Sequence, residues 1–186
     1  LIRISGLSHG TDVWLNNAQD LIKSGKATIS TAICTRDDIM TYLINKGLDS
    51  EESFTIMERV RKGTVAKGKC KDWPEYKKDM LDVPEWYIGS CEKIKYMFPK
   101  AHAAAYVMMA YRIAYCKVNY PLAYYGAYFG IRADAFSYEI MCQGKEKLQY
   151  YIDDYTRRSD SLSKKEQDTM KDMHIVKEMY ARGYEF

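Results

Sequence analysis

The stretch that sets the fold is YMFPKAHAAAYVMMAYRIAYCKVNYPLAYY, residues 96–125. Pro99 suits a first helical turn because its φ is already helical and its missing N–H would have had no partner there. An alanine run with strong helix propensity follows it. At the far end, Pro121 disfavours the α region at the residue before it. The stretch therefore predicts one long helix from Lys100 to about Asn119.

The interior of this predicted helix is almost entirely apolar. Apolar residues recur at i, i+4, i+7 and i+11, and others fill the neighbouring faces; the recurring set is Ala103, Val107, Ala110 and Ala114. We therefore expect most of the circumference to be buried against other helices. No alternating pattern is long enough to build a sheet. The predicted fold class is all-α, a compact domain of about eight helices around this central buried helix, with a helical hairpin at its C-terminal end.

Polar side chains gather in the first turn of the same helix. Lys100 and His102 lie where free backbone N–H groups and the helix dipole favour an anion. Tyr106 lies one turn further on the same face. The pattern predicts a phosphate site with an aromatic ring beside it. The alternative is a solvated lysine, a hydrogen-bonded histidine and a core tyrosine at the start of an ordinary buried helix.

The segment RISGLSHGT, residues 3–11, reads as a loop. Its two glycines permit close backbone approach, and Ser5, Ser8 and His9 offer small polar groups. Such a loop can wrap the edge of a ligand. The alternative is a plain connection into a helix that Thr11 caps. That helix is marked as amphipathic by its apolar residues up to Ile22, and Gly25 ends it.

Helix start signals then mark a pair of helices. Thr35, three residues before an aspartate, predicts one N-cap, and Asp49 or Ser50 predicts the next. Arg36 stands in the first turn of the first helix, where the dipole disfavours a cation, so an external anion or Asp37 must compensate for it. The alternative for Arg36 is a surface salt bridge.

Basic residues follow this pair. Residues 59–78 carry eight Lys or Arg against two acidic residues, and residues 63–71 hold two glycines and no strong apolar period. We interpret residues 63–71 as a mobile basic loop that could follow a phosphate backbone. A solvated loop without a ligand is the alternative.

Composition limits the class of protein. The net charge of +3 is too small to indicate nucleic-acid binding by itself. The five cysteines are scattered, without a C-x-x-C motif or a histidine at zinc-ligand spacing, so we expect neither a metal site nor disulfides, and a reducing compartment. The longest apolar run, residues 103–118, is shorter than the ~20 residues that span a bilayer and contains Arg112. We therefore expect a soluble, cytoplasmic chain without a membrane partner.

Three segments carry a resemblance to a known family. The run FPKAHAAAYVMMAYRIAYCKVNYPLAYY (98–125) resembles the fingers segment of bacterial replicative DNA polymerases of the C family, the polymerase III α subunits. The K-[AS]-H-A-A-A-Y core is shared across that family, whereas SGLSHGTDVW (5–14) and VPEWYI (83–88) are similar to the PolC type in particular. The match runs in one register from Leu1 to about Phe136 and is weaker beyond.

The resemblance implies that the chain is a piece of a longer polypeptide. Residues 1–136 would form a fingers subdomain with a nucleotide-facing helical core. Residues 137–186 would form a helical hairpin that connects to a following duplex-binding region. In this family the carboxylates that hold two metal ions belong to the palm, upstream of Leu1. Because the chain has no D-x-D motif, we expect no catalytic residue, no metal ligand and no cofactor here, and Mg²⁺ only with the nucleotide in the whole enzyme.

The resemblance also implies roles for individual residues. Lys100, His102 and the amides that open their helix would take the triphosphate, and Tyr106 would stack near the base or sugar. Arg36 would approach the triphosphate from the helical pair. Ser5, Ser8 and His9 would shape the floor under the nascent base pair. Residues expected to contact template phosphates are Lys62, Lys67 and Arg132.

The expected partners follow from these roles. They are a deoxynucleoside triphosphate, template-primer DNA and the remaining polymerase domains (palm, thumb and duplex-binding region), with a sliding clamp reached only through segments outside this chain. The fragment should not polymerise DNA alone. Two other functions stay open on the residues: a helical protein-interaction module, and a non-specific binder of single-stranded nucleic acid.

Overall fold

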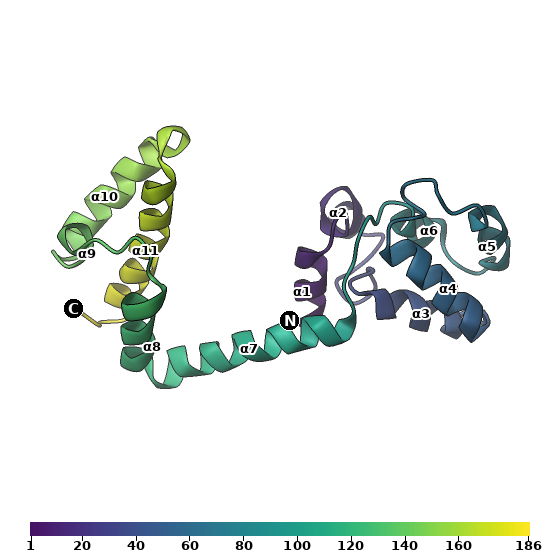
Figure 1. Cartoon of the computed structure of the whole chain (residues 1–186), viewed down its shortest axis with the longest axis horizontal. Coiled ribbons are helices and arrows are strands. Elements are labelled where there is room, and N and C mark those ends of the chain that lie inside the picture. Colours follow the sequence, from purple (N-terminus) through teal and green to yellow (C-terminus); the bar gives the residue numbers. More distant parts are fainter. The chain divides into compact units, whose positions relative to one another are not determined.

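The computed structural model describes all 186 residues and contains eleven α-helices and no β-strand (Figure 1). The one strand-like pairing is an isolated antiparallel bridge between Thr11 and Tyr96. The predicted all-α class is confirmed. There are more helices than the eight expected because several short helices occur where the sequence suggested one continuous helix or a loop.

Backbone contacts divide the chain into two units, Leu1–Ala110 and Tyr111–Phe186. The division falls within α7, Lys100–Asn119, whose bounds agree with the predicted long helix. The predicted boundary after residue 136 lies later in the chain than this division. The candidate residues at the start of α7 therefore belong to the first unit.

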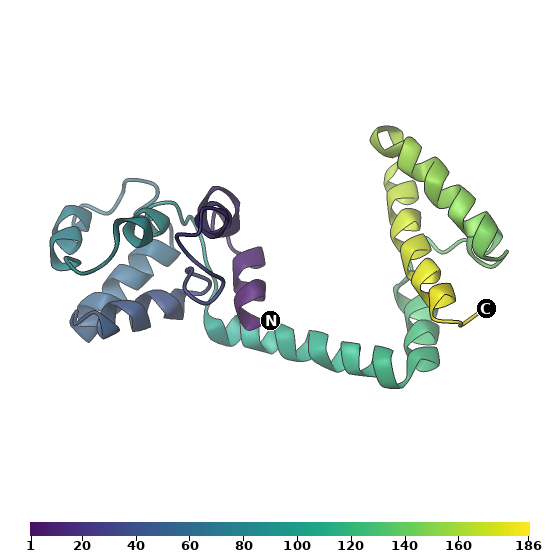
Figure 2. The same ribbon diagram turned by 180° about the vertical axis from the view of Figure 1, so that it is seen from behind.

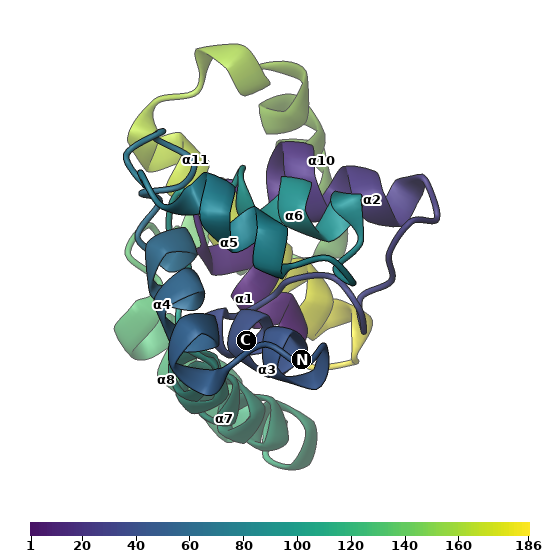
Figure 3. The same ribbon diagram turned by 90° about the vertical axis from the view of Figure 1, so that its right-hand side faces the viewer.

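The first unit holds six helices before α7, and most are short. They are α1 (Ile2–His9), α2 (Gln19–Lys23), α3 (Arg36–Asn45), α4 (Ser50–Arg61), α5 (Trp73–Asp79) and α6 (Glu85–Cys91). The α3 and α4 helices pack against each other (Figure 3). Their buried faces contribute Ile39, Leu43, Ile56 and Val60 to the core, each no more than 1% exposed.

Both predicted caps of this pair are confirmed. The Asp38 carboxylate accepts the backbone N–H of Thr35 at 3.0 Å, which closes the start of α3. The Asp49 carboxylate accepts the backbone N–H groups of Glu51 and Glu52 at 2.8 and 3.1 Å, which closes the start of α4. Such side chains occupy amides that have no partner within the helix.

The prediction of a loop at residues 3–11 is wrong for most of its length, because residues 2–9 form α1. Gly6 does not break this helix; it lets α1 lie directly on the backbone before α3. A Cβ atom at Gly6 would come within 2.4 Å of the Cys34 carbonyl oxygen. Leu7 next to it is buried. Tertiary packing at the glycine outweighs its low helix propensity.

The predicted helix from residue 11 to Ile22 is interrupted. Leu15, Asn16 and Asn17 have non-helical backbone angles, and only α2 continues as a regular helix. The cause is the buried Asn17 side chain, whose amide donates to the Asp12 and Ser90 carbonyls at 2.9 and 3.2 Å. Ser90 Oγ donates back to Asn17 Oδ1 at 2.7 Å. A fully paired buried amide outweighs continuation of the helix.

The basic segment 63–71 consists of hydrogen-bonded turns. Within it, the N–H groups of Lys67, Gly68 and Lys69 donate to backbone carbonyls of residues 63–65 at 2.8 to 3.0 Å. Val65 is buried, and Gly63 lies against the backbone of Lys95. The lysines of this segment are therefore carried on a turn that is fixed to the core at one end.

The second unit is built around a helical hairpin, as predicted. Its helices are α8 (Pro121–Ala127), α9 (Tyr138–Met141), α10 (Lys145–Arg157) and α11 (Lys164–Ala181). The α10 and α11 helices pack side by side (Figure 2). Their core comprises Tyr125, Met141, Leu148, Ile152, Met173, Val176, Met179 and Tyr180. Glu166 accepts the Ser163 N–H at 2.8 Å and so starts α11.

The prediction that α7 is a central buried helix is wrong. Only Ala103 of its residues is buried, whereas Met108, Tyr111 and Val118 are 55%, 66% and 70% exposed. The apolar residues are spread around the helix rather than collected in one stripe, so an apolar composition did not define a face for neighbours within this chain. No helix of the chain is both long enough and apolar enough to cross a membrane.

Candidate functional site

The first turn of α7 places two of the predicted residues together at a surface. The Lys100 side chain is exposed, and no ion pair of the structure includes it. Its backbone N–H donates to the Asp37 carboxylate at 2.6 Å. Asp37 lies in the first turn of α3, so a carboxylate of α3 caps the N-terminal end of α7. The amide of Lys100, which we expected to face a phosphate, is thus already paired.

His102 is held in a row of aromatic rings. Its ring stacks on Phe98 with centroids 4.6 Å apart and planes 14° apart, and Tyr106 covers it with centroids 4.5 Å apart. Tyr96 meets the edge of Phe98 at 5.1 Å. We call Tyr96, Phe98, His102 and Tyr106 the aromatic row. Because Phe98 stacks on one face of the imidazole and the tilted Tyr106 ring lies against it, His102 offers a ligand the nitrogen atoms at its edge.

The backbone before α7 is fixed by hydrogen bonds to three residues that are distant in sequence. Thr11 N donates to Tyr96 O at 2.8 Å, Met97 N to Arg61 O at 3.2 Å, and Arg36 N to Phe98 O at 3.1 Å. These bonds place the aromatic row beside the start of α3 and the end of α4. The position of His102 therefore depends on contacts far from it in sequence.

Four charged residues meet beside this segment; we call Arg36, Glu58, Arg61 and Lys62 the Glu58 cluster. Arg61 donates to both oxygens of the Glu58 carboxylate. Arg36 Nη1 reaches Glu58 Oε1 at 3.3 Å, and Lys62 Nζ reaches Oε2 at 2.9 Å. The salt-bridge alternative for Arg36 is therefore what the structure shows. Hydrogen bonds from Arg61 lower the pKa of Glu58 to about 2.

This lowered pKa predicts a pH dependence of stability. The folded carboxyl titrates near 2 rather than 4.5, so Glu58 stabilises the first unit above pH 4.5, and this contribution is lost as the pH falls from 4.5 to about 2. Glu58→Gln should destabilise the unit near neutral pH, and the difference from wild type should shrink across that interval. Urea unfolding followed by tryptophan fluorescence measures it. A difference that stays constant with pH would contradict the assignment.

A groove of about 490 Å³ lies next to Lys100. It is lined by the start of α1, by Thr35 and Asp38 at the start of α3, and by Val107. Arg3 also lines it and donates to Asp38 at 3.2 Å. The groove gives a ligand held by Lys100 a partly apolar wall next to charged groups.

Ser5, Ser8 and His9 lie on α1 rather than on a loop. His9 Nδ1 is 2.8 Å from both Ser8 Oγ and the Ser5 carbonyl oxygen, so these residues bond to one another. The opposite end of α1 lines the groove with Lys100. They thus belong to the element beside the site, and the structure gives them no direct contact with Lys100 or His102.

The three predicted DNA-contacting residues belong to different parts of the chain. Lys62 belongs to the Glu58 cluster, and Lys67 is exposed in the basic turn. Arg132 is exposed in the second unit, in the turn Tyr128–Arg132 that follows α8.

No group of three or more His, Cys, Asp or Glu side chains is arranged to hold a metal ion. The carboxylates nearest the candidate site are already engaged: Asp37 accepts a backbone amide, and Asp38 accepts Arg3 and two amides.

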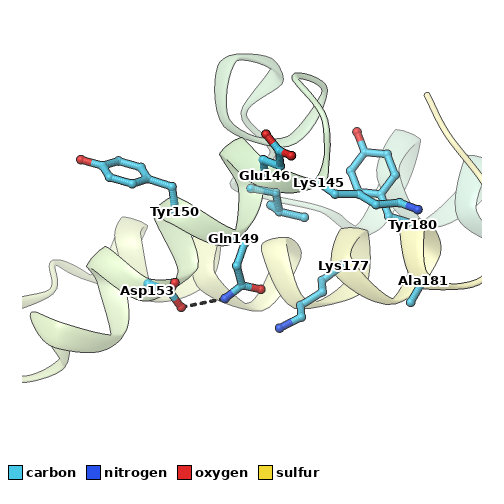
Figure 4. Close-up of a pocket in the computed structure, with 9 residues that line it drawn as sticks. Lys145, Glu146, Gln149, Tyr150, Asp153, Lys177, Tyr180 and Ala181 are labelled. Atoms are coloured by element: carbon cyan, nitrogen blue, oxygen red, sulfur yellow. Dashed lines mark hydrogen bonds between the residues drawn. The ribbon is translucent and has the colours of Figure 1, made fainter.

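A groove larger than the one beside Lys100 lies in the second unit, and sequence reasoning gave no indication of it. It has a volume of about 640 Å³ between α10 and α11, and its residues include Leu148, Tyr150, Lys177 and Tyr180 (Figure 4). None of the predicted site residues lines it.

Sequence reasoning also missed residues that shape the candidate site. Glu58 with Arg61 and Lys62 could have been found, because an acidic residue three and four positions before two cations places all three on one helix face. Asp37 had been considered only as a partner for Arg36. Its bond to Lys100, like the stacking of Phe98, depends on how distant segments fold together.

Comparisons with known proteins agree with the resemblance seen in the motifs. Residues 1–82 match the model for the finger domain of the bacterial DNA polymerase III alpha subunit. Over 184 residues the chain is 55% identical to DNA polymerase III PolC-type of Staphylococcus saprophyticus. The match covers 99% of this chain and 12% of that protein. It is 53% identical over 186 residues to DNA polymerase III PolC-type of Caldanaerobacter subterraneus, covering 100% of this chain and 13% of that protein.

The chain is also 53% identical over 190 residues to DNA polymerase III PolC-type of Streptococcus pyogenes serotype M5. That match covers 100% of this chain and 13% of that protein. The resemblance is confirmed, and it extends to the end of the chain, beyond the motifs that carried it. The chain spans about an eighth of the length of these relatives.

Proposed function

From the similarity of the whole chain to PolC-type DNA polymerase III, we propose that it is the fingers part of a replicative DNA-directed DNA polymerase. In this role it binds the incoming deoxynucleoside triphosphate and the template strand during DNA replication. The observation that carries the proposal is the pair of Lys100 and His102 at one exposed helix start, on a sequence that matches the PolC type.

The phosphates of the nucleotide are bound by side chains rather than by backbone amides. Lys100 supplies a cation without an internal partner, and His102 supplies a ring edge whose direction its stacking neighbours fix. Arg36 approaches from α3, because its amide is bonded to Phe98. Since Asp37 takes the Lys100 amide, that amide contributes to the packing of α3 on α7 instead of to the ligand. These groups stabilise the charge that leaves as pyrophosphate.

The base end is assigned to Tyr106 and α1. Tyr106 is 52% exposed at the end of the aromatic row, so a base or sugar can stack on it. Ser5, Ser8 and His9 on α1 form the floor under the nascent pair. The exposed Lys67 and Arg132, together with Lys62, contact template phosphates without sequence preference.

The chain contributes binding and positioning, and no step of catalysis is assigned to its residues. The palm carboxylates, the thumb and the duplex-binding region belong to the longer polypeptide, and a sliding clamp is reached through those parts. Mg²⁺ arrives with the nucleotide. The fragment alone is inactive as a polymerase. The whole enzyme functions in the bacterial cytoplasm.

The proposal is tested by titrating the isotope-labelled chain with a deoxynucleoside triphosphate and Mg²⁺. Amide shifts should be confined to residues 100–106, residues 5–10 and Arg36, and Lys100→Ala with His102→Ala should abolish them. Lys46→Ala, which removes a charge at the other end of α3, should leave them intact. Absence of shifts at millimolar nucleotide, or shifts that persist in the double variant, would count against a nucleotide site on these residues.

One observation favours a second candidate, a helical protein-interaction module. The exposed Met108, Tyr111, Ile113 and Val118 of α7 give the helix an apolar surface. This candidate predicts no affinity for triphosphates, so the same titration separates the two.

A further inference from the structure

The Glu58 cluster carries more positive charge than it neutralises. Three cations, Arg36, Arg61 and Lys62, share the single carboxylate of Glu58. Two positive charges therefore remain uncompensated within one group of side chains. Like charges held this close repel each other unless a further anion joins them.

The three cations hold the carboxylate unequally. Arg61 donates a hydrogen bond to each oxygen of Glu58. Such a bidentate contact is the strongest arrangement between Arg and carboxylate groups. Arg36 offers only Nη1, at 3.3 Å, so its Nε and Nη2 donors have no side-chain partner. The Lys62 side chain is 56% exposed. Arg61 thus neutralises Glu58, while Arg36 and Lys62 keep donors for another group.

The surroundings place these donors at the candidate site. The Arg36 amide is bonded to the Phe98 carbonyl, directly before the first turn of α7, and Arg61 accepts the amide of Met97. On the other side, Glu58 and Lys62 line a hollow of about 280 Å³ with Arg59, a further cation. The cluster is therefore joined to the backbone segment that leads into α7, and its Lys62 side borders a space that is open to a small anionic group.

We propose that Arg36 and Lys62 form one phosphate-binding site, braced by the Glu58–Arg61 pair. The inference deepens the proposed function and rests on it, because the ligand is a phosphate group of a nucleotide or of a nucleic-acid strand. Sequence reasoning gave Arg36 to the triphosphate and Lys62 to the template; the shared carboxylate assigns both to the same phosphate. Glu58 and Arg61 are positioning residues, because they hold the two cations without touching the ligand.

The test measures two probes on the 186-residue chain by calorimetry or anisotropy. One probe is Mg²⁺-tripolyphosphate, and the other is a fluorescent single-stranded oligonucleotide without terminal phosphates. Arg36→Ala and Lys62→Ala should each weaken binding of the same probe by roughly five- to tenfold, because each removes a charge-assisted contact. Lys62→Arg, which keeps the charge, should retain most of the affinity, and Lys46→Ala should change nothing. Tryptophan fluorescence checks that each variant is folded.

The outcomes separate cleanly. A loss of tripolyphosphate binding in both variants identifies the ligand as a nucleotide phosphate, and a loss of oligonucleotide binding in both identifies it as the strand backbone. If each variant affects a different probe, or only one variant has an effect, the shared site is overturned. If Lys100→Ala weakens tripolyphosphate binding while Arg36→Ala and Lys62→Ala do not, the inference fails and the proposed function stands. If the wild-type chain binds neither probe, both fail.

Discussion

Gly63→Ala should destabilise the first unit by about 2–5 kcal/mol. Gly63 has φ +70°, and an alanine in the left-handed region costs about 1–2 kcal/mol. A Cβ atom there would also come within 2.2 Å of the Lys95 carbonyl oxygen and 2.8 Å of its Cα. Backbone cannot rotate away as a side-chain end can, so the turn or the segment at Lys95 must move, and forced overpacking costs a further 1–3 kcal/mol, roughly.

Gly68→Ala is the matched control for this prediction. Gly68 lies in the same turn and has φ +65°, but nothing lies within 4 Å of a Cβ atom built on it. It should lose only the left-handed penalty, about 1–2 kcal/mol. Trp14, Trp73 and Trp86 all lie in the first unit, so urea unfolding followed by their fluorescence reports this unit alone. Equal losses in the two variants would refute the close approach at Lys95.

The same substitution should also disturb the candidate site. Lys95 and Tyr96 pair with Thr11, and Met97 donates to Arg61, so a shift at Lys95 is passed along the backbone that leads into α7. We expect amide shifts of Tyr96 and Phe98 in Gly63→Ala and none in Gly68→Ala. The basic turn is thereby tied to the residues of the candidate site through backbone packing.

Local signals predicted the features that depend on local chemistry. The bounds of α7 follow from its prolines and alanines, and the starts of α3 and α4 follow from Thr35 and Asp49. The pairing of α10 with α11 follows from apolar period. Lys100, His102 and Tyr106 come together because they lie within two turns of one helix. Each of these features depends on residues a few positions apart, because helix propensity and residue spacing determine local structure.

Features that depend on distant partners were missed. Asn17 interrupts a helix because Ser90, far along the chain, completes its hydrogen bonds. The Lys100 amide is taken by Asp37, and Arg36 is engaged by Glu58. The exposure of α7 was missed because an apolar sequence indicates that burial is favourable. It does not indicate which segment covers the helix.

Gly6 is a second position at which alanine should destabilise the first unit. In sequence, the glycine indicated a loop that permits close backbone approach; in the structure it lies within α1, where the helix meets the Cys34 carbonyl. Gly6→Ala would place Cβ within 2.4 Å of that oxygen and 3.0 Å of the Thr35 methyl carbon. Alanine raises helix propensity by about 1 kcal/mol, but the backbone contact opposes it more strongly. Overpacking of about 1–3 kcal/mol, less the gain in propensity, should leave a net loss of up to about 2 kcal/mol.

The opposite sign is expected at Gly89, which serves as the matched control. It lies inside α6, and nothing is within 4 Å of a Cβ atom built on it. Gly89→Ala should therefore raise the unfolding free energy of the first unit by about 0.5–1 kcal/mol, through helix propensity alone. Tryptophan-detected urea unfolding compares the two variants directly. If Gly6→Ala stabilises the unit as Gly89→Ala does, then α1 does not rest on the backbone before α3, and the placement of Ser5, Ser8 and His9 beside the site loses its support.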